Sequence, residues 1–523
     1  MKRQFTNNFK RKIFIFLLVV VGLLLRLWGS PKNFYWSSDV ARDFLVGSHI
    51  LHYKELLSLG HTAAGFGEPF YYPPYTYYLL ALLQTIFPTP EQLIGFFVII
   101  HALSVPLFVY AVALLFGWPS ALLAGLFMTL SAKMIDLSRL MLVTPALPIL
   151  YVAAILCILA IKRKSHKHLI LGLFCALYAS MFHYSALLYI PLAYLFWILS
   201  LKKKKPFHTF VPPVFVSIVF LISQMPLIIF FGFREFLWYM QPSSNFVLRI
   251  GNMPQKFFVL VFQYWNMIFT TDALLGLLVI ATISLIVIFR SRHIKFLYPV
   301  LIMIGFLGYA IGVMAIMKVT IPEHFFTYFF PLFFLICGYL FGQYWQSLPK
   351  NTLGYSMFIL PLLAFSFAIS GRFIYLTSSQ PLGIGQSVAI AQRVSAYIKE
   401  RVKTDSGFQN SFHFYVSGPN SPIWGTSTVL YYLENELQRK LIRLADKTTS
   451  IEQENDDQYI IVACRYLTDD FLKLWNLTSE EWNTRVCIRN FQEKFRIYKK
   501  YSVVEIPDSS VYDARLFLFS STN

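Results

Sequence analysis

The chain has 523 residues, of which 56% are hydrophobic, 18% aromatic and only 14% charged. Because soluble proteins carry about 25% charged residues, this composition excludes a water-soluble globule and predicts an integral membrane protein. The formal charge of +19 does not indicate a nucleic-acid partner, because residues 1–376 hold 28 Lys and Arg against nine Asp and Glu, whereas residues 377–523 hold 17 of each. The excess falls in short basic runs between apolar segments, which is typical of positive-inside topology.

The apolar runs have the length that a helix needs to cross about 30 Å of hydrocarbon, so a mainly α, polytopic helix bundle is expected over residues 1–376. Basic residues before the first run predict an uncleaved signal anchor with a cytoplasmic N-terminus. About eleven spans are expected, near residues 13–29, 92–117, 119–135, 143–161, 168–186, 187–201, 209–232, 273–290, 296–317, 325–346 and 354–376. This topology places the dense basic runs in the cytoplasm and the C-terminal part outside.

Two further apolar segments are ambiguous. Tyr75–Phe87 is short and directly follows two prolines, which favours a juxtamembrane or re-entrant helix. Residues 257–270 are the second such segment. If both cross, the total is thirteen spans, but the basic runs near residues 162 and 202 then face the wrong side. The aromatic, amphipathic stretch 233–256 predicts an interfacial helix on the outer surface.

The composition changes after residue 376, where balanced charge replaces the aromatic runs. Residues 377–523 predict a soluble, extracytoplasmic α/β domain large enough to bury its own core. Helices are expected at 387–402, 425–437 and 468–476, and strands at 412–416, 459–462, 502–506 and 516–519. Cys464 and Cys487 could form one disulfide if this domain is extracytoplasmic, which the sequence leaves open.

The first outer loop, about residues 30–75, holds four of the nine acidic residues of the membrane part: Asp39, Asp43, Glu55 and Glu68. A carboxylate close to hydrocarbon is costly to desolvate, so this loop is the candidate catalytic region. From Asp39 to Leu57 the pattern is helical, and the structural interpretation of Asp39 is an N-cap or first-turn residue of this helix. Asp39 and Asp43 have i, i+4 spacing on one helix face, and Arg42 is a possible cation partner for Asp43.

A second stretch of the same loop, Gly65-Phe-Gly67-Glu68-Pro-Phe-Tyr71-Tyr72-Pro-Pro74, predicts an irregular segment with aromatic side chains. Glu68, Tyr71 and Tyr72 are candidates for contacts with a sugar ring or an isoprenoid chain. An ordinary interfacial aromatic belt explains the same residues equally well.

The order of these motifs resembles the GT-C superfamily of polytopic glycosyltransferases. The resemblance covers about residues 1–375 and is greatest to bacterial members akin to protein mannosyltransferases and the aminoarabinose transferase of lipid A. It rests on Trp36-Ser-Ser-Asp39-Val-Ala-Arg42-Asp43 after the first span, the Pro-Tyr-rich stretch before Tyr75, Ser138-Arg139 with Pro145 and Pro148, and Phe182-His183-Tyr184.

The resemblance implies transfer of a sugar from a polyprenyl-phosphate carrier to a hydroxyl acceptor on the outer face, with inversion. Asp39 matches the family's base, and Asp43 is the second catalytic candidate. Many relatives have a second acid directly after the first, where this chain has Val40, so which carboxylate touches the acceptor stays open. The lipid-linked sugar is the donor substrate, and no cofactor is obligatory.

The departing phosphate needs cations at the outer surface. Arg139 is the first candidate, and a snorkelling arginine is its structural alternative. His183 and Tyr184 form a second position, where a satisfied structural histidine is the commoner case. Lys318 and His324 form a third. Asp39, Asp43, Glu68 and His61 fit no standard metal motif, so no metal is expected.

Two other classes of function are open from the sequence. One is a transporter or flippase of lipid-linked sugars, although such proteins place ionisable residues at mid-membrane depth and show repeated halves, and neither is visible here. The other is a non-catalytic envelope protein that binds glycans through its C-terminal domain. The expected location is a bacterial plasma membrane, and neither the sugar nor the acceptor can be identified.

Overall fold

The computed structural model describes residues 2–28, 38–54, 56–57, 62–63, 70–71, 74–139, 141, 146–200, 206–231, 253–269, 273–291, 297–316, 326–349, 351–370, 388–403, 411–417, 431, 442–443, 458–465, 478, 487–494, 501–506 and 514–521. The chain forms two compact units. The membrane unit comprises residues 1–29, 57–76 and 92–378, and the mixed unit comprises residues 30–56, 77–91 and 379–523. The mixed unit therefore joins two N-terminal segments to the C-terminal part of the chain.

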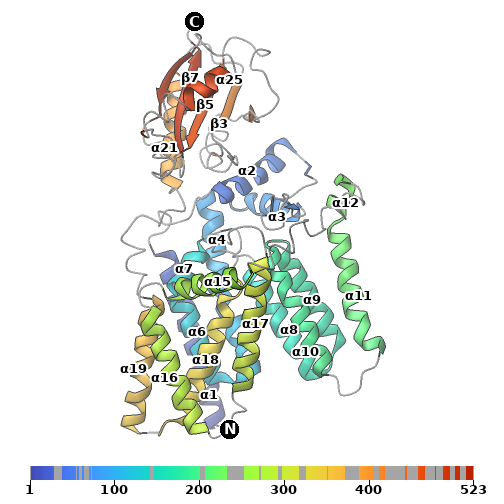
Figure 1. The fold of residues 1–523 in the computed structure, drawn as a ribbon, viewed down its shortest axis with the longest axis vertical. Coiled ribbons are helices and arrows are strands. Elements are labelled where there is room, and N and C mark those ends of the chain that lie inside the picture. Colours follow the sequence, from blue (N-terminus) through green and yellow to red (C-terminus); the bar gives the residue numbers. More distant parts are fainter. Residues whose placement is uncertain are drawn as a thin grey trace. The chain divides into compact units, whose positions relative to one another are not determined.

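Helices dominate the membrane unit (Figure 1). They are α1 (Lys2–Leu27), α4 (Pro90–Leu103), α5 (Val105–Phe116), α6 (Trp118–Leu130), α7 (Ala132–Ser138), α8 (Ala146–Arg163), α9 (His166–Ser180), η1 (Tyr184–Leu188), α10 (Tyr189–Ser200), α11 (Pro206–Ser223), α12 (Met225–Phe231), α15 (Met253–Ile268), α16 (Ala273–Ser291), α17 (Leu297–Ile316), α18 (Phe330–Ser347) and α19 (Thr352–Ser370). A short antiparallel pair joins β1 (Thr62–Ala63) to β2 (Phe70–Tyr71), and β2 falls within the segment 65–74 that was predicted to be irregular.

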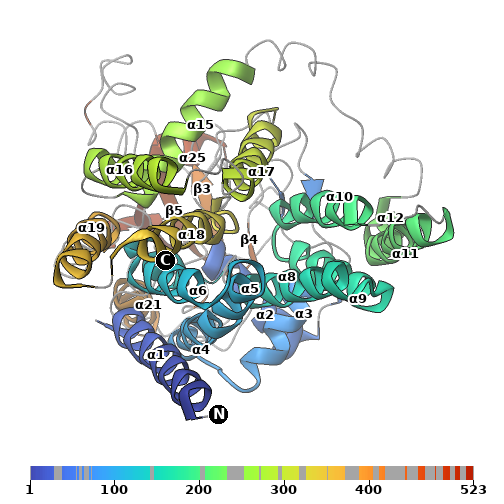
Figure 2. The same ribbon diagram turned by 90° about the horizontal axis from the view of Figure 1, so that it is seen from below.

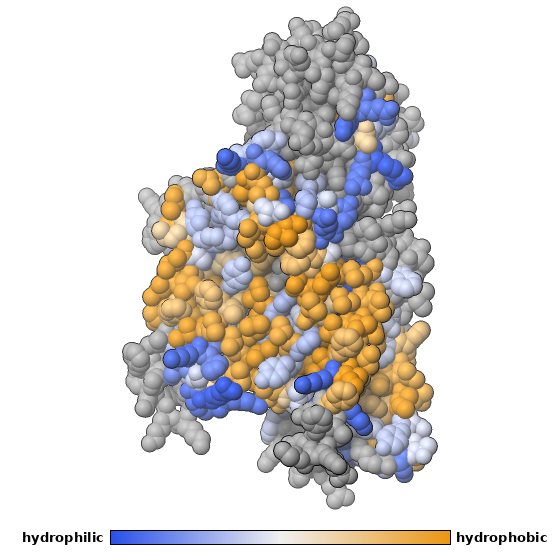
Figure 3. All heavy atoms as spheres, turned by 180° about the vertical axis from the view of Figure 1, so that it is seen from behind, coloured by the Kyte–Doolittle hydropathy of each residue, from blue (hydrophilic) through white to orange (hydrophobic). Residues whose placement is uncertain are grey.

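Each segment expected to span the membrane contains at least one of these helices, which confirms a mainly α, polytopic fold. By length and composition, five helical segments of the described residues could cross a membrane, or six if the bent pair α6 and α7 is one broken span. The count of eleven stays a prediction. Apolar side chains such as Leu278, Leu301 and Leu360 are exposed, and Figure 3 shows a broad band of apolar side chains on one face of the molecule.

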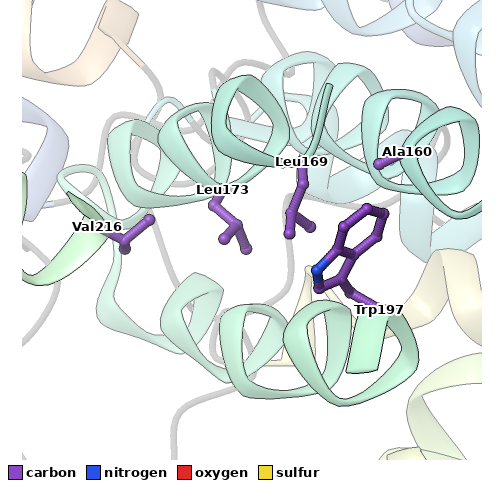
Figure 4. Close-up of a cluster of buried hydrophobic side chains, with 5 residues drawn as sticks. All are labelled: Ala160, Leu169, Leu173, Trp197 and Val216. Atoms are coloured by element: carbon purple, nitrogen blue, oxygen red, sulfur yellow. The ribbon is translucent and has the colours of Figure 1, made fainter. Parts of the chain in front are cut away.

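Two close helix contacts illustrate how the membrane unit packs. A Cβ on Gly338 of α18 would lie 2.6 Å from the Ser120 carbonyl oxygen of α6, so only glycine permits this backbone approach. The two helices lie side by side in the end-on view (Figure 2). Trp197 of α10 is fully buried against Leu169 and Leu173 of α9, in a cluster completed by Ala160 and Val216 (Figure 4).

The mixed unit combines helices with a five-stranded sheet. Its helices are α2 (Ser38–Tyr53), most of α3 (Tyr75–Gln84), α21 (Val388–Lys403) and α25 (Arg489–Lys494). Its strands are β3 (Ser411–Ser417), β4 (Ile442–Arg443), β5 (Gln458–Arg465), β6 (Tyr501–Glu505) and β7 (Ala514–Ser521), in the order β4-β3-β5-β7-β6. β4, β3 and β5 are parallel, whereas β7 and β6 pair antiparallel.

The predicted helix at 387–402 and the four predicted strands are confirmed as α21, β3, β5, β6 and β7. The helical pattern at 425–437 lies outside the described residues except for Tyr431, and the patterns at 468–476 and 233–256 lie almost wholly outside them. β4 and α25 were not predicted. Cys487 is buried and disulfide-bonded, whereas Cys157, Cys175 and Cys337 are free thiols. The domain boundary at residue 376 stays a prediction.

Candidate functional site

Helix α2, the first helix after α1, carries the predicted catalytic carboxylates. It extends from Ser38 to Tyr53, so a helix is confirmed where one was predicted from Asp39 to Leu57, but it ends four residues earlier; Asp39 is its second residue. The structure describes the side chains of α2 from Val40 onward. Asp43 follows Asp39 by one helical turn.

Arg42 and Asp43 form a close ion pair within the mixed unit. Arg42 donates from Nε at 2.9 Å and from Nη2 at 2.7 Å to the same oxygen, Oδ1 of Asp43. The Asp43 side chain is only 4% exposed and that of Arg42 is 20% exposed. The structure thus brings together two of the predicted site residues, and it leaves the guanidinium partly accessible.

Tyr77 of α3 is a third member of this group. Its hydroxyl makes side-chain hydrogen bonds with Asp43 and Arg42. Burial raises the pKa of the Asp43 carboxyl above its usual value, while the charge and hydrogen bond of Arg42 and the hydrogen bond of Tyr77 oppose that rise. Burial and the neighbouring Asp43 carboxylate also raise the pKa of Tyr77, so its hydroxyl stays protonated and can donate to Asp43.

Gln84 ties α3 to α2 at a second point. Its Nε2 donates to the Phe44 carbonyl oxygen at 2.9 Å. A Cβ at Gly47 would lie 2.6 Å from that same Nε2, so glycine makes room for the amide. Sequence reasoning missed both Tyr77 and Gln84. The available signal was their spacing of seven residues, two helical turns, within the apolar run Tyr75–Phe87.

In the membrane unit, Arg139 holds the C-terminal end of α1. Its Nε donates to the Arg26 carbonyl oxygen at 3.1 Å, and its Nη2 donates to those of Leu25 at 3.3 Å and Trp28 at 2.9 Å. The last carbonyls of a helix have no partner within the helix, so a guanidinium placed there satisfies them and favours the helix dipole. A contact between Arg139 and the donor phosphate stays a prediction.

Sequence reasoning also missed a buried pair in the membrane unit. Arg26 is fully buried and donates from Nε to His101 Nδ1 at 3.0 Å. Its Nη1 donates to the Gly22 carbonyl at 3.2 Å and to that of Thr129 in α6 at 3.5 Å, and its Nη2 donates to the Met128 carbonyl of α6 at 3.5 Å. The signal that could have found it is a histidine in the middle of the apolar run 92–117.

His183 caps the short helix η1. Its Nδ1 accepts from the Ser185 backbone N–H at 3.3 Å and lies 2.7 Å from the Ser185 hydroxyl. Capping η1 is a structural role for His183, the commoner case for such a histidine. A contact between His183 and substrate stays a prediction. Tyr184 is the first residue of η1.

The turn that follows the third predicted cation cluster is fully buried. The Tyr264 hydroxyl donates to the Phe329 carbonyl at 2.8 Å, and the Tyr189 hydroxyl donates to the carbonyl of Tyr328. Lys318 and His324 themselves lie outside the described residues.

The other predicted residues of the first loop are described only in part. Glu68 and Tyr72 lie outside the described residues, and Tyr71 is described as part of β2. Within the described residues, no three His, Cys, Asp or Glu side chains cluster. The expectation of a metal-free site stays a prediction, because Glu68 and His61 are not among them.

The bundle of apolar helices, with helix α2 directly after α1, defines a class of protein by its fold. No protein-family model matches the sequence, and no curated protein matches it. The chain has the fold of the GT-C superfamily of polytopic membrane proteins.

Two solved structures carry this conclusion. ArnT from Cupriavidus metallidurans bound to undecaprenyl phosphate superposes with a TM-score of 0.56 at 12% identity, over 96% of this chain and 97% of that one. The archaeal oligosaccharyltransferase AglB from Archaeoglobus fulgidus, in complex with an inhibitory peptide and a dolichol-phosphate, superposes with a TM-score of 0.51 at 11% identity, over 99% of this chain and 75% of that one. At these identities the likeness shows a shared fold.

Proposed function

We propose that this chain is a membrane glycosyltransferase that moves a sugar from a polyprenyl-phosphate carrier to a hydroxyl acceptor on the outer face. The observation that carries the proposal is the likeness, over nearly the whole of both chains, to a protein solved with undecaprenyl phosphate bound. The helix α2, which directly follows the first predicted span and bears Asp39, Arg42 and Asp43, supports it.

In this proposal Asp39 is the general base. An aspartate in the first turn of a helix is favoured as an anion by the helix dipole, and it can accept the proton of the acceptor hydroxyl. The deprotonating oxygen attacks the anomeric carbon from the face opposite the phosphate. The bond from that carbon to the phosphate oxygen breaks, the configuration inverts, and the phosphate leaves with the electron pair. No general acid is required.

Arg42 and Asp43 have separate tasks. Asp43 is almost fully buried and accepts two hydrogen bonds from Arg42, so we assign it to holding the guanidinium in place. Arg42 keeps part of its surface accessible and supplies positive charge for the phosphate. Arg139, His183 and Lys318 are further candidate contacts of the donor. Glu68, Tyr71, Tyr72, Tyr184 and His324 remain candidates for the rim that binds donor and acceptor.

The proposed location is a plasma membrane, with the N-terminus in the cytoplasm and the C-terminal domain outside. The disulfide at Cys487 supports this orientation, because disulfides persist in oxidising compartments and are rare in the cytosol. The donor would then be used on the outer face, where α2 lies in this topology.

The test uses purified full-length protein in lipid nanodiscs with radiolabelled undecaprenyl-phosphate sugars and a panel of hydroxyl acceptors. Transfer by the wild type and loss of transfer in Asp39→Asn, by about 10² to 10⁴, are expected. Glu493→Gln is the matched control, because Glu493 is a surface carboxylate paired with Arg489 in α25. Full activity in Asp39→Asn would exclude Asp39 as the general base. If the wild type instead moves labelled lipid across the bilayer without transfer, the chain is a flippase.

A further inference from the structure

The helix that carries the proposed base is buried over slightly more than half of its circumference. Val40, Ala41, Asp43, Phe44 and Leu45 are each at most 3% exposed, and at 3.6 residues per turn they span an arc of about 200° around α2. A single neighbouring helix covers only one stripe of another helix. α3 supplies one cover, through Tyr77 and Gln84. A second element of the mixed unit must therefore contribute.

Tyr431, from the C-terminal part of the chain, contacts α2 directly. Its ring meets that of Phe44 edge to face, with 5.0 Å between the centroids and an interplanar angle of 79°. Tyr431 is 4% exposed and Phe44 is fully buried. This is the favourable geometry for an aromatic pair, so the contact adds orientation to the burial of apolar surface.

Two polar contacts join the C-terminal part of the chain to residues 88–91 of the mixed unit. The Tyr431 hydroxyl donates to the Pro88 carbonyl at 3.4 Å, which is long for a hydroxyl donor. Gln392 of α21 donates to Glu91 at 3.1 Å on an exposed surface. Neither bond reaches α2, whereas the ring of Tyr431 contacts that helix directly.

Phe44 occupies a sensitive position, because it directly follows Asp43. Its carbonyl is held by Gln84 on one side, and its ring is held by Tyr431 on the other. Loss of the Tyr431 ring would leave an apolar side chain without its cover and would free α2 to move. Displacement of a reacting group by about 1 Å can lower a rate by about 10².

We propose that Tyr431 is a positioning residue of the transfer reaction, through which the C-terminal domain fixes α2 and with it Asp39, Arg42 and Asp43. The inference rests on the proposed function for its kinetic consequence, but the contact with α2 does not depend on it. It gives the C-terminal domain a task in the transfer reaction.

The experiment compares Tyr431→Ala, Tyr431→Phe and Phe517→Leu in the full-length protein. Phe517 is a buried aromatic residue of β7 in the sheet of the mixed unit, so Phe517→Leu reports general loosening of that domain. With undecaprenyl-phosphate sugar as donor, Tyr431→Ala should lower kcat on the order of tenfold or more while the donor KM stays nearly constant. Tyr431→Phe, which keeps the ring, should restore most of kcat.

A second measurement separates this inference from the proposed function. Hydrogen–deuterium exchange of residues 38–53 should be faster in Tyr431→Ala than in the wild type, and unchanged in Tyr431→Phe and Phe517→Leu. This readout holds even if the wild type shows no transfer, in which case only the proposed function fails. Unchanged exchange of α2 in Tyr431→Ala, or an equal loss of kcat in Phe517→Leu, would overturn the positioning role.

Discussion

Arg26 donates from Nε to Nδ1 of His101 at 3.0 Å, and this bond joins the last turn of α1 to α4. Because Nδ1 accepts, His101 is neutral and carries its proton on Nε2. His101 Nε2 has no hydrogen-bond partner among the described residues. The pair therefore fixes one tautomer of the histidine in the interior of the membrane unit.

Removal of the acceptor is the first prediction. His101→Leu leaves a buried arginine donor unsatisfied, so the free energy of unfolding should fall by about 1–3 kcal/mol. Thermal unfolding in detergent measures this. Tyr110→Phe is the control, because Tyr110 lies on the same helical segment but is exposed. If both variants unfold at the wild-type temperature, the pair does not stabilise the bundle.

Arg139 offers a prediction that separates a structural from a substrate role. Arg139→Gln removes the charge and most of the donors that hold the last carbonyls of α1, so thermal stability should fall whether or not donor is present. Arg139→Lys should recover little, because a point charge cannot replace three directed bonds.

The kinetics of the Arg139 variants test whether Arg139 also contacts the donor phosphate. A contact with the phosphate would raise the donor KM by more than the loss of stability explains, and added undecaprenyl phosphate would protect the wild type against unfolding more than the variants. Equal protection of all three proteins would assign Arg139 to α1 alone.

The structural elements that depend on local sequence pattern were predicted correctly from the sequence. The apolar runs that became α8, α16, α17 and α19 were recognisable because a span needs about 20 apolar residues in sequence. α2 followed from its helical spacing, and the role of Arg42 as a partner of Asp43 followed from adjacency. The four main strands of the C-terminal domain followed from short β-branched and aromatic runs.

Long-range contacts were beyond prediction. Arg139 and Arg26 lie 113 positions apart, and their contact depends on which faces of α1 and α7 meet. The same holds for Tyr77 beside Asp43, since the apolar run containing Tyr77 does not reveal its neighbour. The composition change at residue 376 gave no sign that residues 30–56 belong to the same compact unit as the C-terminal part.

The Arg42–Asp43 pair should act as one unit in catalysis. Asp43→Asn weakens the hydrogen bonds that hold the Arg42 guanidinium, and Arg42→Lys removes the two nitrogen donors of that guanidinium. Each variant should therefore lower kcat/KM on the order of tenfold or more. The double variant should be little worse than either single one, because both break the same connection. Steady-state kinetics with labelled donor measures this, and fully additive losses would contradict the assignment.

The pH dependence follows from the raised pKa of Asp43. Ionised Asp43 holds Arg42, so transfer should be lost as pH falls through a value above the ordinary aspartate pKa of about 4. Stability has the opposite sign. The folded chain binds the Asp43 proton more tightly than the unfolded chain, so the contribution of this group to stability is largest below the ordinary pKa and declines as pH rises through the raised one.

Asp43→Asn isolates this group from Asp39, which also titrates. Its weaker residual activity should lack the acid limb due to Asp43, and its stability should vary less with pH over the same interval. Matching pH profiles of wild type and Asp43→Asn, measured both by transfer and by thermal unfolding, would place the titrating group elsewhere.

The last prediction concerns the side of the membrane on which the C-terminal domain lies. Cys487 is disulfide-bonded and fully buried, and Cys464, with its backbone in β5, is the partner that the sequence suggests.

In intact cells a membrane-impermeant maleimide should not label Cys487. After treatment with an impermeant phosphine reductant, the maleimide should label Cys487, because the reductant reaches a domain on the outer side of the membrane. Because reduction frees both partners of the disulfide, the double variant Cys464→Ser/Cys487→Ser should abolish the labelling that follows reduction. Cys175, a free thiol in α9, should stay unlabelled throughout. If Cys487 is labelled only after the cells are permeabilised, the C-terminal domain lies in the cytoplasm, and the proposed use of donor on the outer face fails with it.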